Sequence, residues 1–303
     1  MTARTKGDLR GFTIRDELTY GTFNASGTST YGGVAQSLDP SGGKSFSDDV
    51  TDGSFKFATP VVTGLGAGFK IKFRYPVSSE WQTWVTRAIG ALTGIGALRD
   101  ITPFSTVFKV ASDELLSWTG CKVDSLIISS SKIGDLLDFS ATILARYGTE
   151  SATTAFVNAD GTSYTFGEAT RPSYAPISDN TPWQYSTDEG DTWQSCDHKT
   201  WELSITRGLQ ADAANVNGLP LDAGLSLIPT KCEVQLKFTQ LSKSAIWDEL
   251  KFDGPIDLQF KKVMDTKTIL LTGCYLLPDN HPSRSQSPYD ETIVASVQDI
   301  TVT

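Results

Sequence analysis

The chain has 303 residues, of which 39% are hydrophobic, 10% aromatic and 20% charged, so it can bury the core of one large or two medium domains and is not a disordered chain. Its 26 basic and 35 acidic residues give a net charge of −9, which argues against a protein that grips nucleic-acid phosphates and suits a surface that repels them. No apolar run is long enough to span a bilayer and the N-terminus lacks an apolar signal core, so we expect no membrane partner.

The first part of the chain, residues 1–60, is polar and rich in Gly, Ser and Thr. Such a segment buries little apolar surface. We therefore expect a long arm or extended hairpin loops here, ordered against a partner.

A clearer pattern begins at residue 69. Residues 69–75 alternate apolar and basic side chains, which predicts a half-buried strand with one wet face. The apolar spacing over 80–92 predicts an amphipathic helix, with Ser78 or Ser79 as its N-cap and Gly90 near its end.

The rest of the chain is dominated by predicted strands. Residues 152–166 predict a hairpin that turns at Asp160-Gly161, 208–228 a long polar loop and 242–250 a short helix. The remaining predicted strands are 103–111, 114–130, 135–147, 200–206, 230–240, 256–263, 267–277 and 292–302.

Two parts of the sequence resemble each other. Lys109-Val110 followed by 116–121 matches Lys262-Val263 followed by 269–274, and each copy comes after a strand that leads into a helix. We expect a mainly β protein with two tandem β-barrel or sandwich domains, each with one short flanking helix. The first covers 1–150 and includes the polar arm (1–60); the second covers 151–303 and includes a linker and hairpin (151–199). The repeat signature is Thr119, Gly120 and Cys121, matched by Thr272, Gly273 and Cys274.

Signals for catalysis are weak. Ser41–Ser45 lacks the first glycine and the upstream strand of a phosphate-binding loop, and Gly64–Gly68 precedes a strand rather than following one. The histidines, His198 and His281, have no partners at metal-ligand spacing, and none of the four cysteines lies in a CxxC pair. We expect reduced thiols, no enzymatic activity, and no catalytic, cofactor-binding or metal residues.

One local motif is complete and resembles the Asp-box turns of sialidases and other β-proteins. We expect a structural hairpin turn; calcium binding at its acidic residues is the alternative. Likewise, the seven tryptophans suggest core packing before carbohydrate stacking. The motif consists of Ser186, Asp188, Gly190, Thr192 and Trp193.

The segment 116–129, LSWTGCKVDSLIIS, resembles a signature strand of the tail tube proteins (major tail proteins) of long-tailed bacteriophages. The alternating strand 137–147, the strand-then-helix step at 69–92 and the run Ile205–Leu209 before a long loop are similar too. The resemblance covers most of 60–303.

This resemblance implies a structural virion protein built on small β-barrels. In the family, six domains form a ring, rings stack into a hollow tail tube, and neighbouring sheets join around the lumen. DNA passes through during ejection without specific binding, and a tape measure protein occupies the lumen during assembly in the host cytoplasm. Two domains per chain would give a trimer with pseudo-sixfold symmetry; a spurious repeat would give a hexamer.

Other functions stay open. A terminator, distal tail or baseplate protein would suit the repeat almost as well, and the Asp box and tryptophans would suit a carbohydrate-binding β-sandwich. On a tube protein, the long loops at 17–58 and 208–228 would reach adjacent subunits. The basic side chains Lys70, Lys72 and Arg74 are expected to pair with acidic neighbours.

Overall fold

The prediction of a mainly β fold is confirmed: the part of the chain described below holds nineteen strands and one helix, α1. The computed structural model describes residues 11–24, 27–47, 61–77, 80–90, 101–111, 114–151, 155–157, 163–165, 176–196, 198–211, 227–241, 258–276 and 290–303.

The elements fall into two halves along the chain. The first half contains β1 (Gly11–Asp16), β2 (Thr30–Ser47), β3 (Val61–Arg74), α1 (Gln82–Ile89), β4 (Phe104–Ala111), β5 (Glu114–Ser130), β6 (Asp138–Ala145) and β7 (Tyr147–Ser151). A small hairpin follows, β8 (Ala155–Val157) and β9 (Ser163–Thr165). The second half contains β10 (Gln184–Ser186), β11 (Gln194–Ser195), β12 (Thr200–Thr206), β13 (Leu209–Ala211), β14 (Leu227–Pro229), β15 (Glu233–Leu241), β16 (Leu258–Met264), β17 (Lys267–Leu276), β18 (Asp290–Val297) and β19 (Asp299–Val302).

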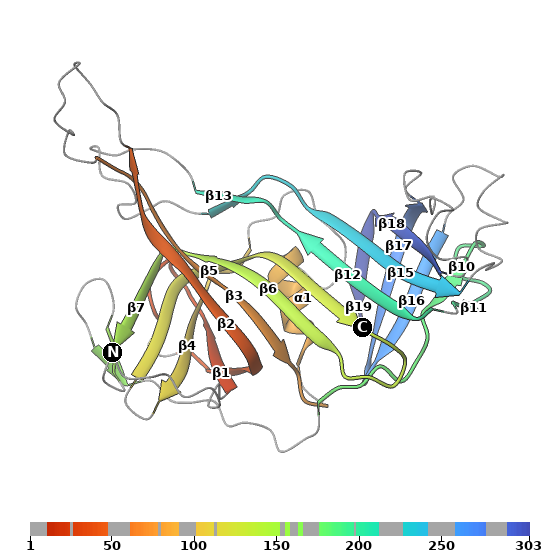
Figure 1. Ribbon diagram of the computed structural model, residues 1–303, viewed down its shortest axis with the longest axis horizontal. Helices are drawn as coiled ribbons and strands as arrows, with labels where there is room; N and C mark the ends of the chain where they lie inside the picture. The colour runs from red at the N-terminus through yellow and green to blue at the C-terminus, as the bar shows by residue number, and fades with distance from the viewer. Residues whose placement is uncertain are drawn as a thin grey trace.

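The first six strands close into an antiparallel barrel (Figure 1). Going round it, β1 pairs with β4, β4 with β5, β5 with β6, β6 with β3, β3 with β2, and β2 again with β1. Because side chains alternate along each strand, every second residue enters the interior. That interior is aromatic and fully buried, with Phe12, Phe69, Phe73, Phe108, Trp118 and Phe139 among its side chains.

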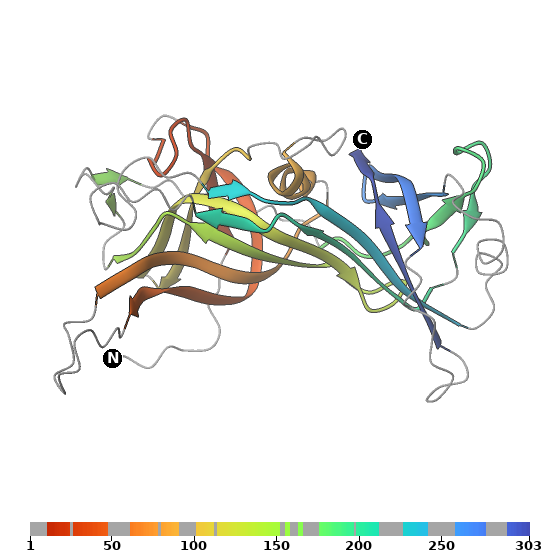
Figure 2. The same cartoon turned by 90° about the horizontal axis from the view of Figure 1, so that it is seen from above.

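Helix α1 packs on the inner side of the sheet, behind β5 and β6 in Figure 1 and above them in Figure 2. Its Trp84 contacts the rings of Phe12 and Phe73 and donates a hydrogen bond from Nε1 to the Gly32 carbonyl. The predicted helix is confirmed but shorter than expected. Gly90 ends it in the left-handed conformation, as glycine does at many helix ends.

The predicted cap is wrong. Trp81 occupies the N-cap position and its side chain makes no capping bond. Instead, the first turn is closed by a backbone hydrogen bond from Thr83 to Glu80, and Trp81 is held by burial among core side chains. The start of this helix is therefore set by the packing of Trp81 and not by a capping serine side chain.

The second half repeats the pairing order of the first. β10 pairs with β16, β16 with β17, β17 with β18, β18 with β15, and β15 with β12, so these strands follow the order of β1, β4, β5, β6, β3 and β2. Among the described strands, the closing pair between β10 and β12 is missing. The predicted helix at 242–250 and the predicted turn at Asp160-Gly161 lie outside the described residues, whereas the hairpin flanking that turn is confirmed.

Strand pairing corrects one detail of the sequence match. Phe108 lies opposite Leu116, and Lys262 lies opposite Ile269, the counterpart of Leu116. Lys262 therefore occupies the place of Phe108, and the match of Lys109 with Lys262 is displaced by one residue. The cause is an extra residue in the β4–β5 hairpin, whose register shifts between Lys109 and Ala111.

Strand β5 joins the two halves into a continuous sheet. Its first part pairs with β4 and β7, and its last residues pair with β6 on one side and β12 on the other. We call the six residue pairs from Trp201–Ser130 to Thr206–Ser125 the β5–β12 seam. Figure 1 shows the sheet running without a break from β2 to β15.

Of the two forms expected for this segment, the arm is wrong for β1 and β2, which are barrel strands, whereas the extended hairpin is present, since β2 forms a long hairpin with β3. Few apolar residues suffice there: Phe12 and Ile14 fill the interior, while Gly32 and Gly33 let the rings of Phe12 and Phe73 come close. Residues 1–10 and 48–60 lie outside the described part.

Other boundaries shift where the chain bends. The predicted strand 135–147 is β6 followed, after Arg146, by β7, and 292–302 is split into β18 and β19 at Gln298. The loop 208–228 contains the paired strands β13 and β14 at its ends. Core packing is confirmed for Trp81, Trp84, Trp118, Trp183 and Trp201, and all four cysteines are free thiols.

Candidate functional site

The most extensive feature of the molecule is the wet face of the continuous sheet, formed by β2, β3, β6, β5, β12, β15 and β18. Partly or fully exposed residues alternate with buried ones along these strands, so the opposite face is the packed one. Cross-strand pairing places the wet-face residues in rows that cross both halves. The central row is Ser37, Lys72, Ser140, Ile127, Ser204, Gln235 and Ser296.

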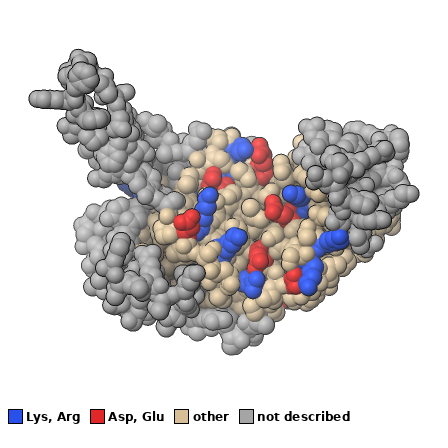
Figure 3. Space-filling model, viewed as in Figure 1, with Lys and Arg blue, Asp and Glu red and all other residues tan. Residues whose placement is uncertain are grey.

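Charges on the wet face compensate one another between adjacent strands. Arg74 Nε lies 2.6 Å from Asp138 Oδ1, so the expected acidic partner is found for one of the three basic side chains Lys70, Lys72 and Arg74. Glu202 lies opposite Lys237, an arrangement that stabilises antiparallel strands. Figure 3 shows blue and red side chains interspersed over this face, without a large patch of either sign.

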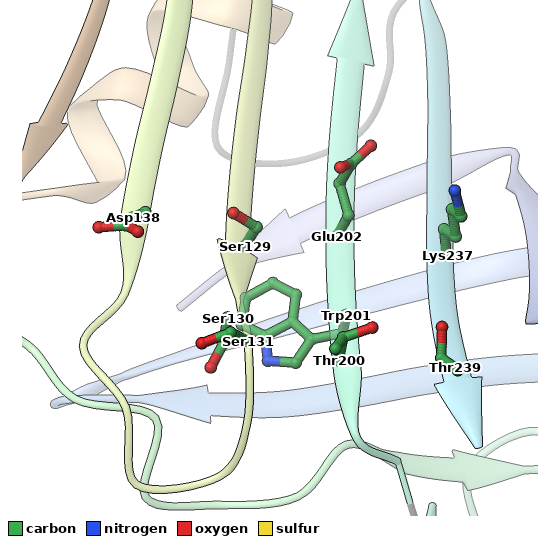
Figure 4. A pocket seen from close by; sticks show the side chains of 9 residues that line it. All are labelled: Ser129, Ser130, Ser131, Asp138, Thr200, Trp201, Glu202, Lys237 and Thr239. Carbon is green, nitrogen blue, oxygen red and sulfur yellow. The ribbon is translucent and has the colours of Figure 1, made fainter. Parts of the chain in front are cut away.

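A polar pocket of about 300 Å³ lies where the seam ends on this face. Its hydroxyl and charged groups come from neighbouring strands: Figure 4 shows Asp138 on β6, Ser129 on β5, Glu202 on β12 and Lys237 on β15. No histidine or cysteine lines it. The lining groups are the solvated side chains of the sheet, and they do not form the nucleophile and base pair that acyl transfer requires.

The Thr-Gly-Cys signature forms the same bulge in each half. Thr119 and Gly120 together face Ser105, because Phe104 lies opposite Cys121 and Thr106 opposite Trp118. In the second half, Thr272 and Gly273 face Gln259 in the same way. Both glycines have positive φ, 64° and 59°, which only glycine adopts without strain.

Replacing Gly120 by alanine should lower the free energy of unfolding by roughly 2–3 kcal/mol. A Cβ there would lie 2.6 Å from Arg146 Cβ, so overpacking adds to the left-handed backbone penalty. Gly134→Ala is the matched control, because its φ is 91° and nothing lies within 4 Å of the added Cβ. Urea denaturation should show the larger loss for Gly120; equal losses would contradict the close approach.

Glu17 anchors the segment after β1 to this bulge. Its carboxylate accepts hydrogen bonds from Ser105 Oγ at 2.6 Å and from the amides of Gly120 and Gly21, both at 2.8 Å. Burial raises the pKa of Glu17 above its usual value, and these hydrogen bonds offset the rise only in part. The sequence carried no signal for this cluster, because Glu17 stands within the polar segment interpreted as an arm.

A raised pKa at Glu17 makes a pH effect testable. Between the unfolded pKa near 4.5 and the higher folded pKa, the folded chain holds a proton that the unfolded chain lacks. Relative to Glu17→Gln, wild-type stability should therefore rise as pH falls from 7 toward about 4.5. Urea unfolding of both proteins across this range measures the difference; a difference that stays flat or grows with pH would be the wrong sign.

The Asp-box residues form the turn between β10 and β11. Ser186 Oγ donates to Asp188 Oδ1 at 2.6 Å and accepts from the Gly190 amide, and Asp188 Oδ1 also accepts from the Thr192 amide. These bonds hold the pKa of Asp188 down at about 2. Trp193 is half-buried beneath Lys261, whose Nζ lies 4.0 Å from the ring centroid. Asp188 Oδ1 is thus already bound by hydrogen-bond donors of the turn itself.

The run Ile205–Leu209 ends β12 at the top of the seam. Arg207 is fully buried, its amide donates to the Asp124 carbonyl, and the Leu209 amide donates to Asp124 Oδ1. Gly208 between them has a φ of 56°, which allows the chain to leave the sheet abruptly. These contacts tie the end of β12 to β5.

The geometry defines a β-protein with a long antiparallel sheet that has one packed face and one wet face carrying charges of both signs. Within the described residues, no group of His, Cys, Asp and Glu could hold a metal ion, and no helix could cross a membrane.

The sequence matches the phage tail tube protein family over residues 7–302, nearly the whole chain, and the chain therefore belongs to that family. It is a structural component of a bacteriophage tail, which assembles with itself into a tube. No curated protein matches the chain.

Proposed function

We propose that this chain builds the tail tube from stacked rings of three chains, each chain supplying two tube domains to a pseudo-sixfold ring. The domains are residues 1–150 and 151–303. The wet face lines the lumen, where a tape measure protein lies during assembly in the host cytoplasm and through which DNA passes during ejection without specific binding. No enzymatic activity is needed for this role.

The repeated pairing order carries the proposal. Six strands of each half follow one order, and each half has the Thr-Gly-Cys bulge at the same place, next to the bend between β6 and β7 or between β18 and β19. Similar sequence segments can arise by coincidence. The same pairing order of six strands in both halves is a stronger sign of two equivalent domains, because it involves contacts between residues far apart in the sequence. Two equivalent domains per chain halve the number of chains that a six-domain ring needs.

The ends of the sheet support closure into a ring. Among the described strands, β2 beyond Val34 has β3 as its one partner, and Asp290–Val294 of β18 has β15 as its one partner. Open edges of this kind add further strands readily. Within the chain, β12 occupies the place of β2 and uses its second edge for the β5–β12 seam. We expect the edge of β2 to join a neighbouring chain in the manner of that seam.

The charge pattern supports a non-binding lumen. Binding to DNA by counterion release needs basic side chains that are free to meet phosphates. On the wet face, Arg74 is engaged by Asp138 and Lys237 lies opposite Glu202. Cations that face a carboxylate in this way are less available to the phosphates of a passing polyanion.

Electron microscopy of the purified protein and of virion tails, with averaging of end-on views and mass per ring, tests the proposal. Tubes of three-chain rings with six similar lobes are expected. Six chains per ring would overturn the two-domain arrangement while leaving a tube. Capped single rings that never stack would favour a tail terminator, the alternative function.

A further inference from the structure

A buried ion pair ties the linker before β10 to the second half of the molecule. Asp179 Oδ1 lies 2.5 Å from Lys262 Nζ, and both side chains are fully buried. Asp179 Oδ2 accepts a hydrogen bond of 2.7 Å from Trp201 Nε1, and Lys262 Nζ donates to the Thr181 carbonyl at 2.5 Å. We call these four residues, Asp179, Thr181, Trp201 and Lys262, the linker tie.

The backbone of the same linker is bound to the first half. The Asp179 amide donates to the Asp135 carbonyl at 2.7 Å, and the Gly134 amide donates to the Asp179 carbonyl at 2.6 Å. Just before it, Ile177 donates to the Tyr75 carbonyl. Asp179 therefore binds the first half through its main chain and the second half through its carboxylate.

The fold does not need a charge at this place. Lys262 occupies the position that Phe108 fills in the first half, where Phe108 stacks on Phe12 with ring centroids 4.7 Å apart. The chain thus contains an apolar solution to the same packing problem. Buried ion pairs are seldom more stabilising than such apolar packing, and their best-attested use is to fix register. The charge on Lys262 is explained by its ion pair with Asp179.

The β5–β12 seam alone would leave the angle between the halves adjustable. Neighbouring strands in a sheet twist relative to one another over a range of roughly 10–35°. The linker tie begins at Trp201, whose pair with Ser130 is at one end of the seam, and reaches through Lys262 to β16, which is not a seam strand. An attachment that extends from one end of the seam to another strand of the second half opposes the rotation that a strand pair permits.

We infer that Asp179 and Lys262 are positioning residues that fix the angle between the two halves and so set the curvature of the assembly, a role that rests on the proposed function for its consequence in the ring. The partner whose geometry they control is a second copy of this chain.

The test separates angle from stability. The apolar variant Asp179→Leu/Lys262→Phe/Trp201→Phe removes the polar contacts among these three side chains and leaves no charge unpaired. A milder variant, Asp179→Asn/Lys262→Met, serves if the first does not fold. As the control, Lys231→Gln/Glu233→Gln removes an exposed ion pair at the start of β15.

Distances in the unassembled full-length chain give the first readout. Nitroxide labels on non-canonical residues at Thr22 and Gln194 span the two halves, and labels at Thr22 and Lys132 stay within the first. Pulsed electron paramagnetic resonance should give a distribution of Thr22–Gln194 label distances that is at least twice as wide in the apolar variant as in wild type, and of intermediate width in the milder variant. The distribution of Thr22–Lys132 label distances should be unchanged. The control should match wild type.

Assembled particles give the second readout, with mixed diameters or unclosed arcs expected for the apolar variant. A folded variant whose Thr22–Gln194 distribution keeps the wild-type width overturns the inference, whatever happens to its melting temperature. If wild type itself forms no tubes, the proposed function fails while the distance measurement still decides the role of the linker tie.

Discussion

Asp179→Ala should lower the free energy of unfolding by about 3–5 kcal/mol, because it leaves the buried ammonium of Lys262 without its anion. Burial already lowers the pKa of Lys262, and Asp179 is the main group that opposes this shift. Trp201 Nε1 would also lose its acceptor. Chemical denaturation at pH 7 measures the loss.

The matched control is Asp138→Ala, which breaks an ion pair of nearly equal length on the wet face. The side chains of Arg74 and Asp138 are 32% and 54% exposed, so water replaces the lost contact and the expected cost is below about 1 kcal/mol. A cost for Asp179→Ala as small as that of the control would show that solvent reaches Lys262.

Trp84→Ala should lower the free energy of unfolding by about 3–5 kcal/mol, because it leaves a cavity between α1 and the barrel. The indole is fully buried, lies 4.6 Å from the Phe73 ring centroid, and donates to the Gly32 carbonyl. The surrounding aromatic side chains lie on strands of the closed barrel, so they cannot move far enough to fill the cavity. Thermal and urea unfolding followed by circular dichroism provide the measurement.

Trp193→Ala serves as the comparison for Trp84. Trp193 is half-buried at the far edge of the second half and contacts Lys261 through its ring face, a contact worth roughly 1 kcal/mol. If both tryptophans cost the same, α1 would not be anchored through Trp84. A larger loss for Trp84 with unchanged secondary structure in native buffer is the expected outcome.

Strands with strict alternation were predictable from sequence. The bounds of β5 and β12 agree with the expected 114–130 and 200–206. β12 alternates between buried and wet side chains along its whole length, whereas β5 is buried from Leu116 to Val123 and alternates only from Ser125 to Ser130. β2 was missed because an edge strand next to glycines needs few apolar residues. The bends at Arg146 and Gln298 were missed because single residues break the strands there without glycine or proline.

The candidate site was predictable only in part. Arg74 was expected to have an acidic partner, and the sheet supplies Asp138 from a strand distant in sequence. Glu202 and Lys237 carried no signal, because their pairing depends on the register between β12 and β15. The linker tie was also missed: Asp179 lies in a Pro-containing linker and Lys262 was aligned one residue away from its structural counterpart. Register between distant strands is what sequence patterns do not contain.

The β5–β12 seam has a kinetic consequence for any assembly of this chain. Contacts between separate molecules form at a rate that depends on their concentration, whereas the two strands of the seam belong to one chain and meet at an effective concentration fixed by the intervening polypeptide. Dilution cannot weaken that junction, and it can be complete before any second molecule arrives. Only the junctions between chains then depend on protein concentration. The onset of polymerisation is therefore governed by fewer intermolecular encounters than the total number of sheet junctions in the assembly.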